Sequence, residues 1–199
     1  MFKIDLMDLL KEEYTYPNWS SGMKYKLETE IINEEEIYVF YYSTKTIMKK
    51  RFQRKFPRYI YLTPGFCWGL GFFKGEGLNS IRGTSYRRFI ITNKSPTCLN
   101  KFLDELNNSK LLLKSAIKGK CFQIHHFLNS ADEVVNYWSN KLNFPKKMFS
   151  PLNYDDGFKK EGNGVCHFDK GDVLLRRIFD IINNKIITGA KTPQLTSAG

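Results

Sequence analysis

The sequence predicts an α+β fold, because segments in which apolar residues recur at helical spacing are separated by segments in which apolar and polar residues alternate. Helical spacing is clearest in residues 96–107 and 131–142, and alternation is clearest in residues 86–92 and 121–128. At 199 residues, the chain is long enough for one domain with an extension or for two small domains. Helices and β-hairpins are therefore expected to follow one another along the chain.

The formal net charge of +11 indicates a polyanionic partner, since each Lys or Arg that neutralises a phosphate releases a condensed counterion. Nucleic acid is the first candidate, and an anionic membrane surface is the second. No apolar segment reaches the roughly 18 residues that a membrane-spanning helix needs, and Asp5 comes too early for a secretion signal. We therefore expect an intracellular protein, cytoplasmic or associated with the nucleoid, that does not cross a membrane.

Residues 1–60 are expected to form an N-terminal extension that contains a strand at 37–42. Within this extension, residues 44–60 contain basic side chains and no acidic one. Such a run is either a solvated face or, because aromatic residues are interleaved with it, a surface beside a phosphate backbone. The second interpretation assigns nucleic-acid contacts to Lys49, Lys50 and Arg51.

A glycine-containing helix is predicted for residues 64–76, with Thr63 as its N-cap and a proline at its first position. Each interior glycine costs about 1 kcal/mol relative to alanine in a helix. Gly71 and Gly75 lie four residues apart and thus on one face, where a second backbone can approach closely. This spacing predicts a helix-helix interface. Glu76 lies at the helix end that disfavours negative charge, so two such carboxylates at that interface predict a divalent metal site.

Gly, Ser and Pro residues divide the rest of the chain into alternating and helical segments. The segment 145–164 is rich in Pro, Asn and Gly and is expected to be a connection. The predicted elements are a hairpin with strands at 78–82 and 86–92, a helix at 96–107, a hairpin with strands at 111–118 and 121–128 and a turn at Gly119, a helix at 131–142, a strand at 165–168, a helix at 173–182 and a disordered tail at 188–199.

Because successive residues of a strand point to opposite faces, one face of the predicted hairpins is mixed and basic. Arg and Lys pair with guanine, and Gln pairs with adenine, in the major groove of DNA. The alternative interpretation is that these are ordinary exposed strand residues. The outward-facing candidates for nucleic-acid contact are Ser80, Arg82, Tyr86, Arg88, Lys114, Lys118, Gln123 and His125.

The order helix, hairpin, helix, hairpin, helix, which begins with the glycine-rich segment Gly69–Gly77, resembles the LAGLIDADG homing endonuclease family. The resemblance covers about residues 63–142. One copy of the motif is visible, and family members with one copy act as homodimers. The resemblance implies an αββαββα saddle with a curved antiparallel sheet over residues 61–187, in addition to the N-terminal extension and an extra C-terminal strand and helix.

The same resemblance implies roles for individual residues. Gly71 and Gly75 match the small residues of the family's helix interface, and Glu76 matches its metal-binding acid, for which we expect Mg²⁺. Asn93 falls where the family places a polar residue that orients the attacking water. Lys94 is expected to supply positive charge to the transition state. Catalysis is therefore assigned to Glu76, Asn93 and Lys94.

The expected function is a sequence-selective endonuclease that acts on double-stranded DNA with divalent metal as a homodimer. The alternative is a nucleic-acid-binding protein of the same fold that does not cut. It would be either a transcriptional regulator or an RNA-splicing maturase, and RNA would be the partner of the maturase. The glycines from Gly69 onwards also imitate a dinucleotide-binding motif. That motif needs a strand that runs directly into its first glycine, whereas residues 64–68 separate Gly69 from the preceding extended segment, so this interpretation is excluded.

Overall fold

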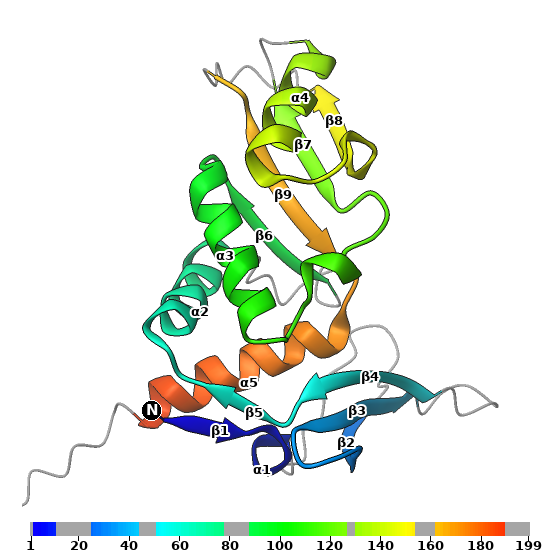
Figure 1. Cartoon of the computed structure of the whole chain (residues 1–199), viewed down its shortest axis with the longest axis vertical. Helices are drawn as coiled ribbons and strands as arrows, with labels where there is room; N and C mark the ends of the chain where they lie inside the picture. The colour runs from blue at the N-terminus through cyan, green and yellow to red at the C-terminus, as the bar shows by residue number, and fades with distance from the viewer. Residues whose placement is uncertain are drawn as a thin grey trace, which may run out of the picture.

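The computed structural model describes residues 2–10, 25–43, 51–77, 88–126, 130–153 and 162–189 (Figure 1). This part of the chain has the predicted α+β class and contains sheets of two, three and four strands. Among the described helices, none combines the length and the apolar character that crossing a membrane requires.

The N-terminal residues form two small antiparallel sheets, one from the pair β1 and β5 and one in the order β2-β3-β4. The strand predicted at 37–42 is confirmed as part of β3, and part of the basic segment 44–60 forms β4. The short helix α1 follows β1 and buries three leucines. The bounds are β1 (Lys3–Asp5), α1 (Leu6–Leu10), β2 (Tyr25–Ile31), β3 (Glu36–Ser43), β4 (Arg51–Pro57) and β5 (Tyr59–Tyr61).

The glycine-containing helix α2 (Pro64–Glu76) has the predicted bounds. Thr63 caps it, because its side-chain oxygen accepts a hydrogen bond of 3.0 Å from the backbone N–H of Phe66. Gly77 follows with φ at −71°, an ordinary extended conformation. A Cβ atom at Gly77 would lie 2.2 Å from the carbonyl oxygen of Phe73. A glycine is therefore needed here for steric reasons and not for a left-handed backbone.

The next two predicted helices are confirmed. α3 (Pro96–Asn108) buries the predicted apolar face, and α4 (Ala131–Leu142) begins with a capping box between Ser130 and Glu133. β6 (Phe89–Asn93) overlaps the second strand of the first predicted hairpin, expected at 86–92. The first strand of that hairpin, at 78–82, lies outside the described residues. The buried face of α3 consists of Leu99, Phe102, Leu103 and Leu106.

The prediction of a second hairpin is wrong. Leu111 and Leu112 are both buried, which an alternating strand cannot achieve, and a 3-10 turn η2 (Lys114–Ala116) follows them. The backbone N–H of Leu112 donates to the carbonyl of Leu106 at the end of α3. Segment 111–118 thus packs against α3 and does not pair with β7 (Phe122–His126), which pairs with other strands.

Those partners come from the C-terminal part of the chain. β8 (Phe149–Asn153), preceded by the turn η3 (Lys146–Met148), pairs with β7 in parallel. α4 connects the two strands, and a helix crossover of this kind is what makes a parallel pair possible. β8 lies in a segment that was predicted to be a connection, so this prediction is wrong there.

β9 (Val165–Lys170) confirms the strand predicted at 165–168 and lies between β6 and β7, so that the sheet has the order β6-β9-β7-β8. α5 (Val173–Gly189) begins where predicted and extends beyond residue 182. It runs between the four-stranded sheet with its helices and the N-terminal strands (Figure 1). The predicted tail lies outside the described residues from residue 190 onwards.

A group of stacked phenylalanines joins α2, β6, α3 and α5. The rings of Phe73 and Phe89 are parallel with centroids 4.7 Å apart. Phe179 on α5 meets both rings edge-on at 5.1 Å, and Phe102 on α3 lies 6.1 Å from Phe89. All four side chains are at most 1% exposed. The main helices and the first strand of the large sheet therefore share one core.

An ion pair joins the N-terminal sheet to this core. Arg54 on β4 contacts the carboxylate of Asp172 and donates to the carbonyl of Leu111. Asp172 also accepts a hydrogen bond of 2.9 Å from the backbone N–H of Leu175 in the first turn of α5. Burial lowers the pKa of Arg54 to about 10, which leaves it cationic at neutral pH. One carboxylate thus positions both β4 and the start of α5.

Replacing Phe179 by alanine should lower the free energy of unfolding by about 3–5 kcal/mol, because the substitution leaves a cavity between α5 and three other elements. Urea denaturation followed by circular dichroism measures this change. Phe2→Ala is the matched control, since Phe2 is 84% exposed and its loss should change the free energy by less than about 0.5 kcal/mol. Equal unfolding midpoints for the two variants would contradict the proposed role of the phenylalanine group.

Candidate nucleic-acid interface

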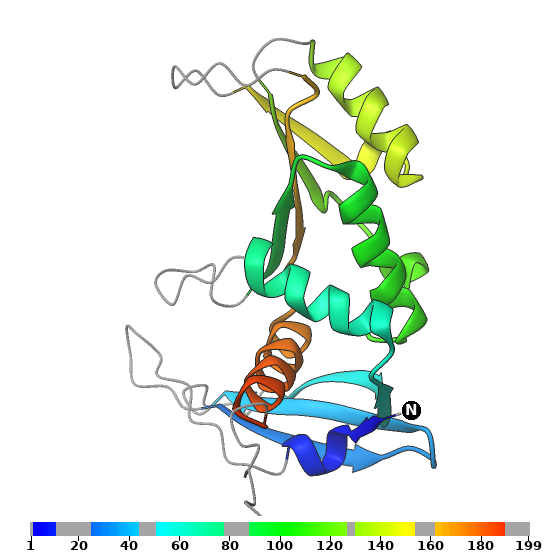
Figure 2. The same cartoon turned by 90° about the vertical axis from the view of Figure 1, so that its left-hand side faces the viewer.

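The four-stranded sheet has one face under helices and one face that no described helix covers. α3 and α4 lie on the same side of the sheet (Figure 2). Toward them the strands present buried residues such as Phe89, Ile124 and Phe168. The strand registers place the alternate residues on the opposite side, which we call the open face. It consists of Arg88, Ile90, Thr92, Gln123, His125, Ser150, Leu152, Val165, His167 and Asp169.

A polar row crosses the open face. Thr92, His167, Gln123 and Ser150 lie next to one another on four adjacent strands and are all half-buried. The Thr92 Oγ1 and His167 Nδ1 atoms are 2.7 Å apart, and the ring centroids of His167 and His125 are 4.1 Å apart. Hydroxyl, imidazole and amide groups of this kind contact base edges and phosphates.

Arg88 has a defined orientation beside this row. Its Nε donates to Asp169 Oδ1 at 2.8 Å, and its Nη2 lies 2.5 Å from Asp169 Oδ2. The Arg88 side chain is 48% exposed, whereas that of Asp169 is 7% exposed. Pairing at two points fixes the plane of the guanidinium group. Asp169 therefore orients Arg88 through Nε and Nη2, and no contact of Nη1 with another described residue uses the remaining donor group.

The backbone of Glu76 lies next to the polar row. Gly77 forms an antiparallel bridge with Ile91, which places the backbone of Glu76 beside that of Thr92. The last turn of α2 reaches the side of the sheet that α3 and α4 leave open (Figure 2). Glu76 is exposed. The structure therefore puts a carboxylate at the edge of the open face.

The glycines of α2 divide between two faces. A Cβ atom at Gly69 would contact Phe102 at 3.7 Å, and one at Gly65 would meet the carboxylate of Glu105. These two glycines let α2 pack closely against α3. Gly71 and Gly75 are exposed, and no described atom lies within 4 Å of a Cβ atom built at either position. Within the protomer, α2 thus approaches α3 through Gly65 and Gly69, while the dimer interface predicted at Gly71 and Gly75 stays a prediction.

The other two predicted catalytic residues follow β6. Asn93 faces the side of Phe89 and Ile91, and its side-chain oxygen accepts a hydrogen bond of 2.8 Å from the backbone N–H of Ser95. Asn93 thereby helps to form the turn before α3. Lys94 is exposed at the same end of the strand.

The described part of the basic segment, residues 51–60, is used largely within the molecule. Besides Arg54, Lys55 pairs with Glu36 at 2.6 Å and Arg58 pairs with Asp5 at 2.9 Å. Hydrogen bonding to Asp5 raises the pKa of Arg58, and hydrogen bonding to Lys55 lowers the pKa of Glu36. In the described half of this segment, Arg54, Lys55 and Arg58 are therefore engaged in ion pairs with other parts of the chain.

Of the predicted phosphate contacts in this segment, Lys49 and Lys50 lie outside the described residues, as do Ser80, Arg82 and Tyr86 of the first hairpin. Arg51 is the first residue of β4 and pairs with Tyr42 of β3 in the strand register.

Lys114 and Lys118 do not belong to the sheet, so their predicted place on the outer face of a hairpin is wrong. Lys114 lies in η2, where its Nζ is 2.6 Å from Asp104 Oδ1 on α3. Lys118 lies in the turn that precedes β7. The packing of Leu111 and Leu112 against α3 removes both lysines from the strand.

Gln123 and His125 are found where predicted, opposite the buried Phe122 and Ile124. Sequence reasoning missed Ser150 and Asp169 and left His167 without a defined role. The alternation of Val165, His167 and Asp169 is the signal in β9 that could have placed these residues on one face.

Among the described residues, no group of three or more His, Cys, Asp or Glu side chains is arranged to hold a metal ion. Within the described residues, Glu76 therefore does not belong to a group of this kind. Comparison of the chain with protein-family models, with curated proteins and with solved structures finds no match.

Proposed function

We propose that this protein binds double-stranded DNA with the open face of its four-stranded sheet and cleaves it as a homodimer. The observation that supports this proposal most directly is the combination, on one face, of a polar row, an arginine oriented by Asp169 and the Glu76 end of α2. Strands can enter the major groove, where Arg reads guanine and Gln reads adenine. Arg88 and Gln123 are the proposed base-reading residues.

The homodimer is proposed from the outer face of α2. Gly71 and Gly75 have open space beside them in the described part of the protomer, so a second backbone can approach there. Two copies of α2 packed through these glycines bring two copies of Glu76 together at the same end. A homodimer of this kind is what the resemblance to the LAGLIDADG family implies.

In the described part of one protomer the donor set for Mg²⁺ is incomplete, because Mg²⁺ takes oxygen ligands in octahedral geometry and Glu76 supplies a single carboxylate. Two protomers supply two carboxylates. When bound, Mg²⁺ would supply Lewis-acid stabilisation of the phosphodiester and an activated water. In this proposal Glu76 holds the ion, and Lys94 provides positive charge near the scissile phosphate.

Because Glu76 belongs to no metal-holding group among the described residues, the second candidate is a DNA- or RNA-binding protein of the same fold that does not cleave. Such a regulator or maturase needs the open face but not the pair of acids. Binding and cleavage must therefore be tested separately.

DNA binding should be steeply dependent on salt. If the surface neutralises about 6–10 phosphates, affinity should fall by about 10³–10⁵ between roughly 50 and 200 mM salt. Fluorescence anisotropy with random-sequence DNA measures this slope. Arg88→Ala and Gln123→Ala should alter sequence preference, whereas Lys141→Ala on the helix side should not. Affinity that does not change with salt would exclude the nucleic-acid proposal.

Gly75→Leu should dissociate the dimer, because the larger side chain separates the two copies of α2, an overpacking effect of about 1–3 kcal/mol. Sedimentation velocity measures the oligomeric state. The protomer should stay folded, since the space beside Gly75 is open in the described structure. Thr97→Leu is the control, because it adds an exposed leucine on α3 instead. A Gly75→Leu variant that remains a dimer would place the interface elsewhere.

Glu76→Gln should abolish Mg²⁺-dependent cleavage while DNA affinity is kept or increased, since a negative charge near the phosphates is removed. A nicking assay on a randomised DNA library measures cleavage. Asp132→Asn removes an exposed acid on α4 and should cut like the wild type. Persistent cleavage by Glu76→Gln would place the active site elsewhere. Tight binding without cleavage by the wild type would instead favour the non-cutting candidate.

A further inference from the structure

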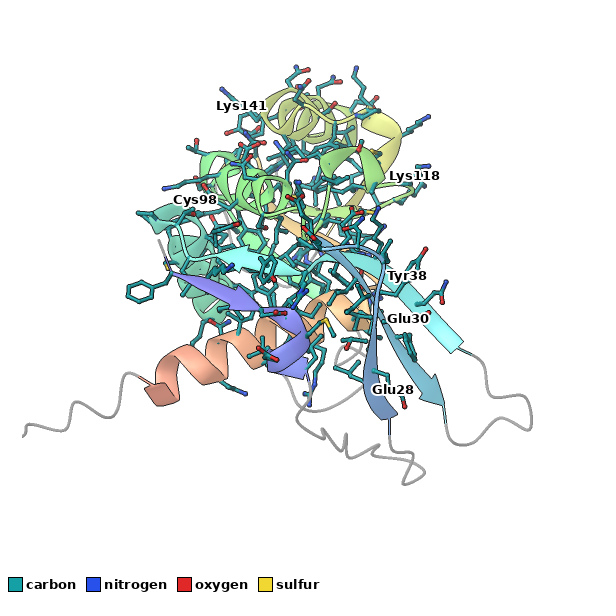
Figure 3. The ribbon with its side chains drawn as sticks, turned by 60° about the horizontal axis from the view of Figure 1, so that its bottom comes forward. Glu28, Glu30, Tyr38, Cys98, Lys118 and Lys141 are labelled. Carbon is teal, nitrogen blue, oxygen red and sulfur yellow. The ribbon has the colours of Figure 1, made fainter. Side chains whose placement is uncertain are left out.

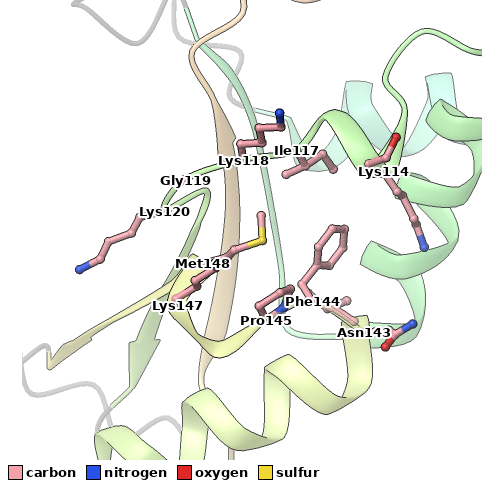
Figure 4. Close-up of a pocket in the computed structure, with 12 residues that line it drawn as sticks. Lys114, Ile117, Lys118, Gly119, Lys120, Asn143, Phe144, Pro145, Lys147 and Met148 are labelled. Carbon is pink, nitrogen blue, oxygen red and sulfur yellow. The ribbon is translucent and has the colours of Figure 1, made fainter.

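A pocket of about 690 Å³ lies between the segment that precedes β7 and the segment that follows α4 (Figure 4). One wall is formed by Lys114, Ser115 and residues 117–120, and the other by Leu142 to Pro145 together with Lys147 and Met148. No open-face residue lines it. The pocket is therefore separate from the surface proposed to bind DNA.

The pocket combines an apolar floor with a basic rim. Figure 4 shows the side chains of Ile117, Phe144 and Met148 pointing toward the middle, with lysines around them. None of the described residues that line the pocket is acidic. The lining lysines are Lys114, Lys118, Lys120 and Lys147.

Three of these lysines are available for an anion. Lys114 is engaged by Asp104, but Lys118, Lys120 and Lys147 are exposed and make no ion pair with any described residue. Gly119, with φ at +79°, forms the turn between Lys118 and Lys120 and holds both lysines on the rim. Concentrated positive charge of this kind attracts phosphate groups.

The floor is already formed. The Phe144 ring packs against Phe122 with centroids 5.0 Å apart. The backbone N–H of Cys121 donates to the carbonyl of Met148 at 3.1 Å, which joins the two walls. A preformed pocket loses less entropy when a ligand binds, and this volume lies in the range of about 300–1,000 Å³ that is typical of small-molecule sites.

We propose that this pocket binds a nucleoside phosphate, with the base against Phe144 and Met148 and the phosphates among Lys118, Lys120 and Lys147. The apolar floor is suited to the flat ring of a base. The rim is basic and has no acidic residue among its described lining, so it is suited to the phosphates. The nucleotide is either free or the 5′-phosphorylated end of a nucleic-acid strand, since both present the same chemistry. The pocket is independent of DNA binding by the open face.

Isothermal titration with ATP, pyrophosphate, adenosine and a 5′-phosphorylated dinucleotide tests this proposal. ATP or the dinucleotide should bind saturably and more tightly than pyrophosphate or adenosine, because each fragment fills only part of the pocket. Whichever of the two binds more tightly identifies the source of the ligand. The double variant Lys118→Gln, Lys120→Gln should weaken that binding by about tenfold or more, as expected for the loss of contacts to charged groups.

The matched control is a second double variant, Lys110→Gln with Lys141→Gln, which removes the same amount of positive charge from exposed positions outside the pocket. In the view of Figure 3, Lys141 is labelled to the left and Lys118 to the right of the upper part of the molecule. The control should bind as the wild type does, and both variants should unfold at the wild-type midpoint. Equal weakening by the two double variants, or the absence of saturable binding by ATP and by the dinucleotide, would overturn the proposal. Arg88→Ala should leave this affinity unchanged, which separates the pocket from the open face.

Discussion

The stacking of Phe73 on Phe89, closed by Phe179, is the contact on which the rest of the structure depends. It holds the last turn of α2 against β6, and the same turn ends at Gly77, where a Cβ atom would collide with the Phe73 carbonyl. The bridge from Gly77 to Ile91 follows directly from this packing. Because the aromatic stack fixes the end of α2 beside the sheet, it also fixes the position of Glu76 relative to the polar row.

The open face depends on two features of chain topology. α4 returns the chain so that β8 can pair in parallel with β7, and β9 then enters between β6 and β7. β7 and β8 are consecutive strands separated by α4, whereas β9 pairs with two strands that are not its neighbours in the sequence. Thr92, His167, Gln123 and Ser150 become one row through these long-range pairings, and the same pairings bring Asp169 to Arg88.

The distribution of charge shows why net charge alone is a weak guide to a binding surface. Arg54, Lys55 and Arg58 belong to the most basic stretch of the sequence, yet each forms an ion pair within the chain. Arg54 in particular has a structural function, since it joins β4 to the start of α5. By contrast, Lys118 and Lys120 come from one segment and Lys147 from another, and the three lysines gather at one pocket only in the folded protein.

The sequence by itself determined the local elements. Thr63-Pro64, Ser95-Pro96 and Ser130 marked the starts of α2, α3 and α4, because caps and helical spacing act within a few residues. It also identified Gln123 and His125 as outward-facing. Only the tertiary structure decided which strands pair, that Leu111 and Leu112 pack on α3 in place of forming a hairpin, and that Gly65 and Gly69 face α3 whereas Gly71 and Gly75 face outward. These outcomes depend on contacts between residues far apart in the chain, whose energies exceed local propensities and leave no local pattern in the sequence.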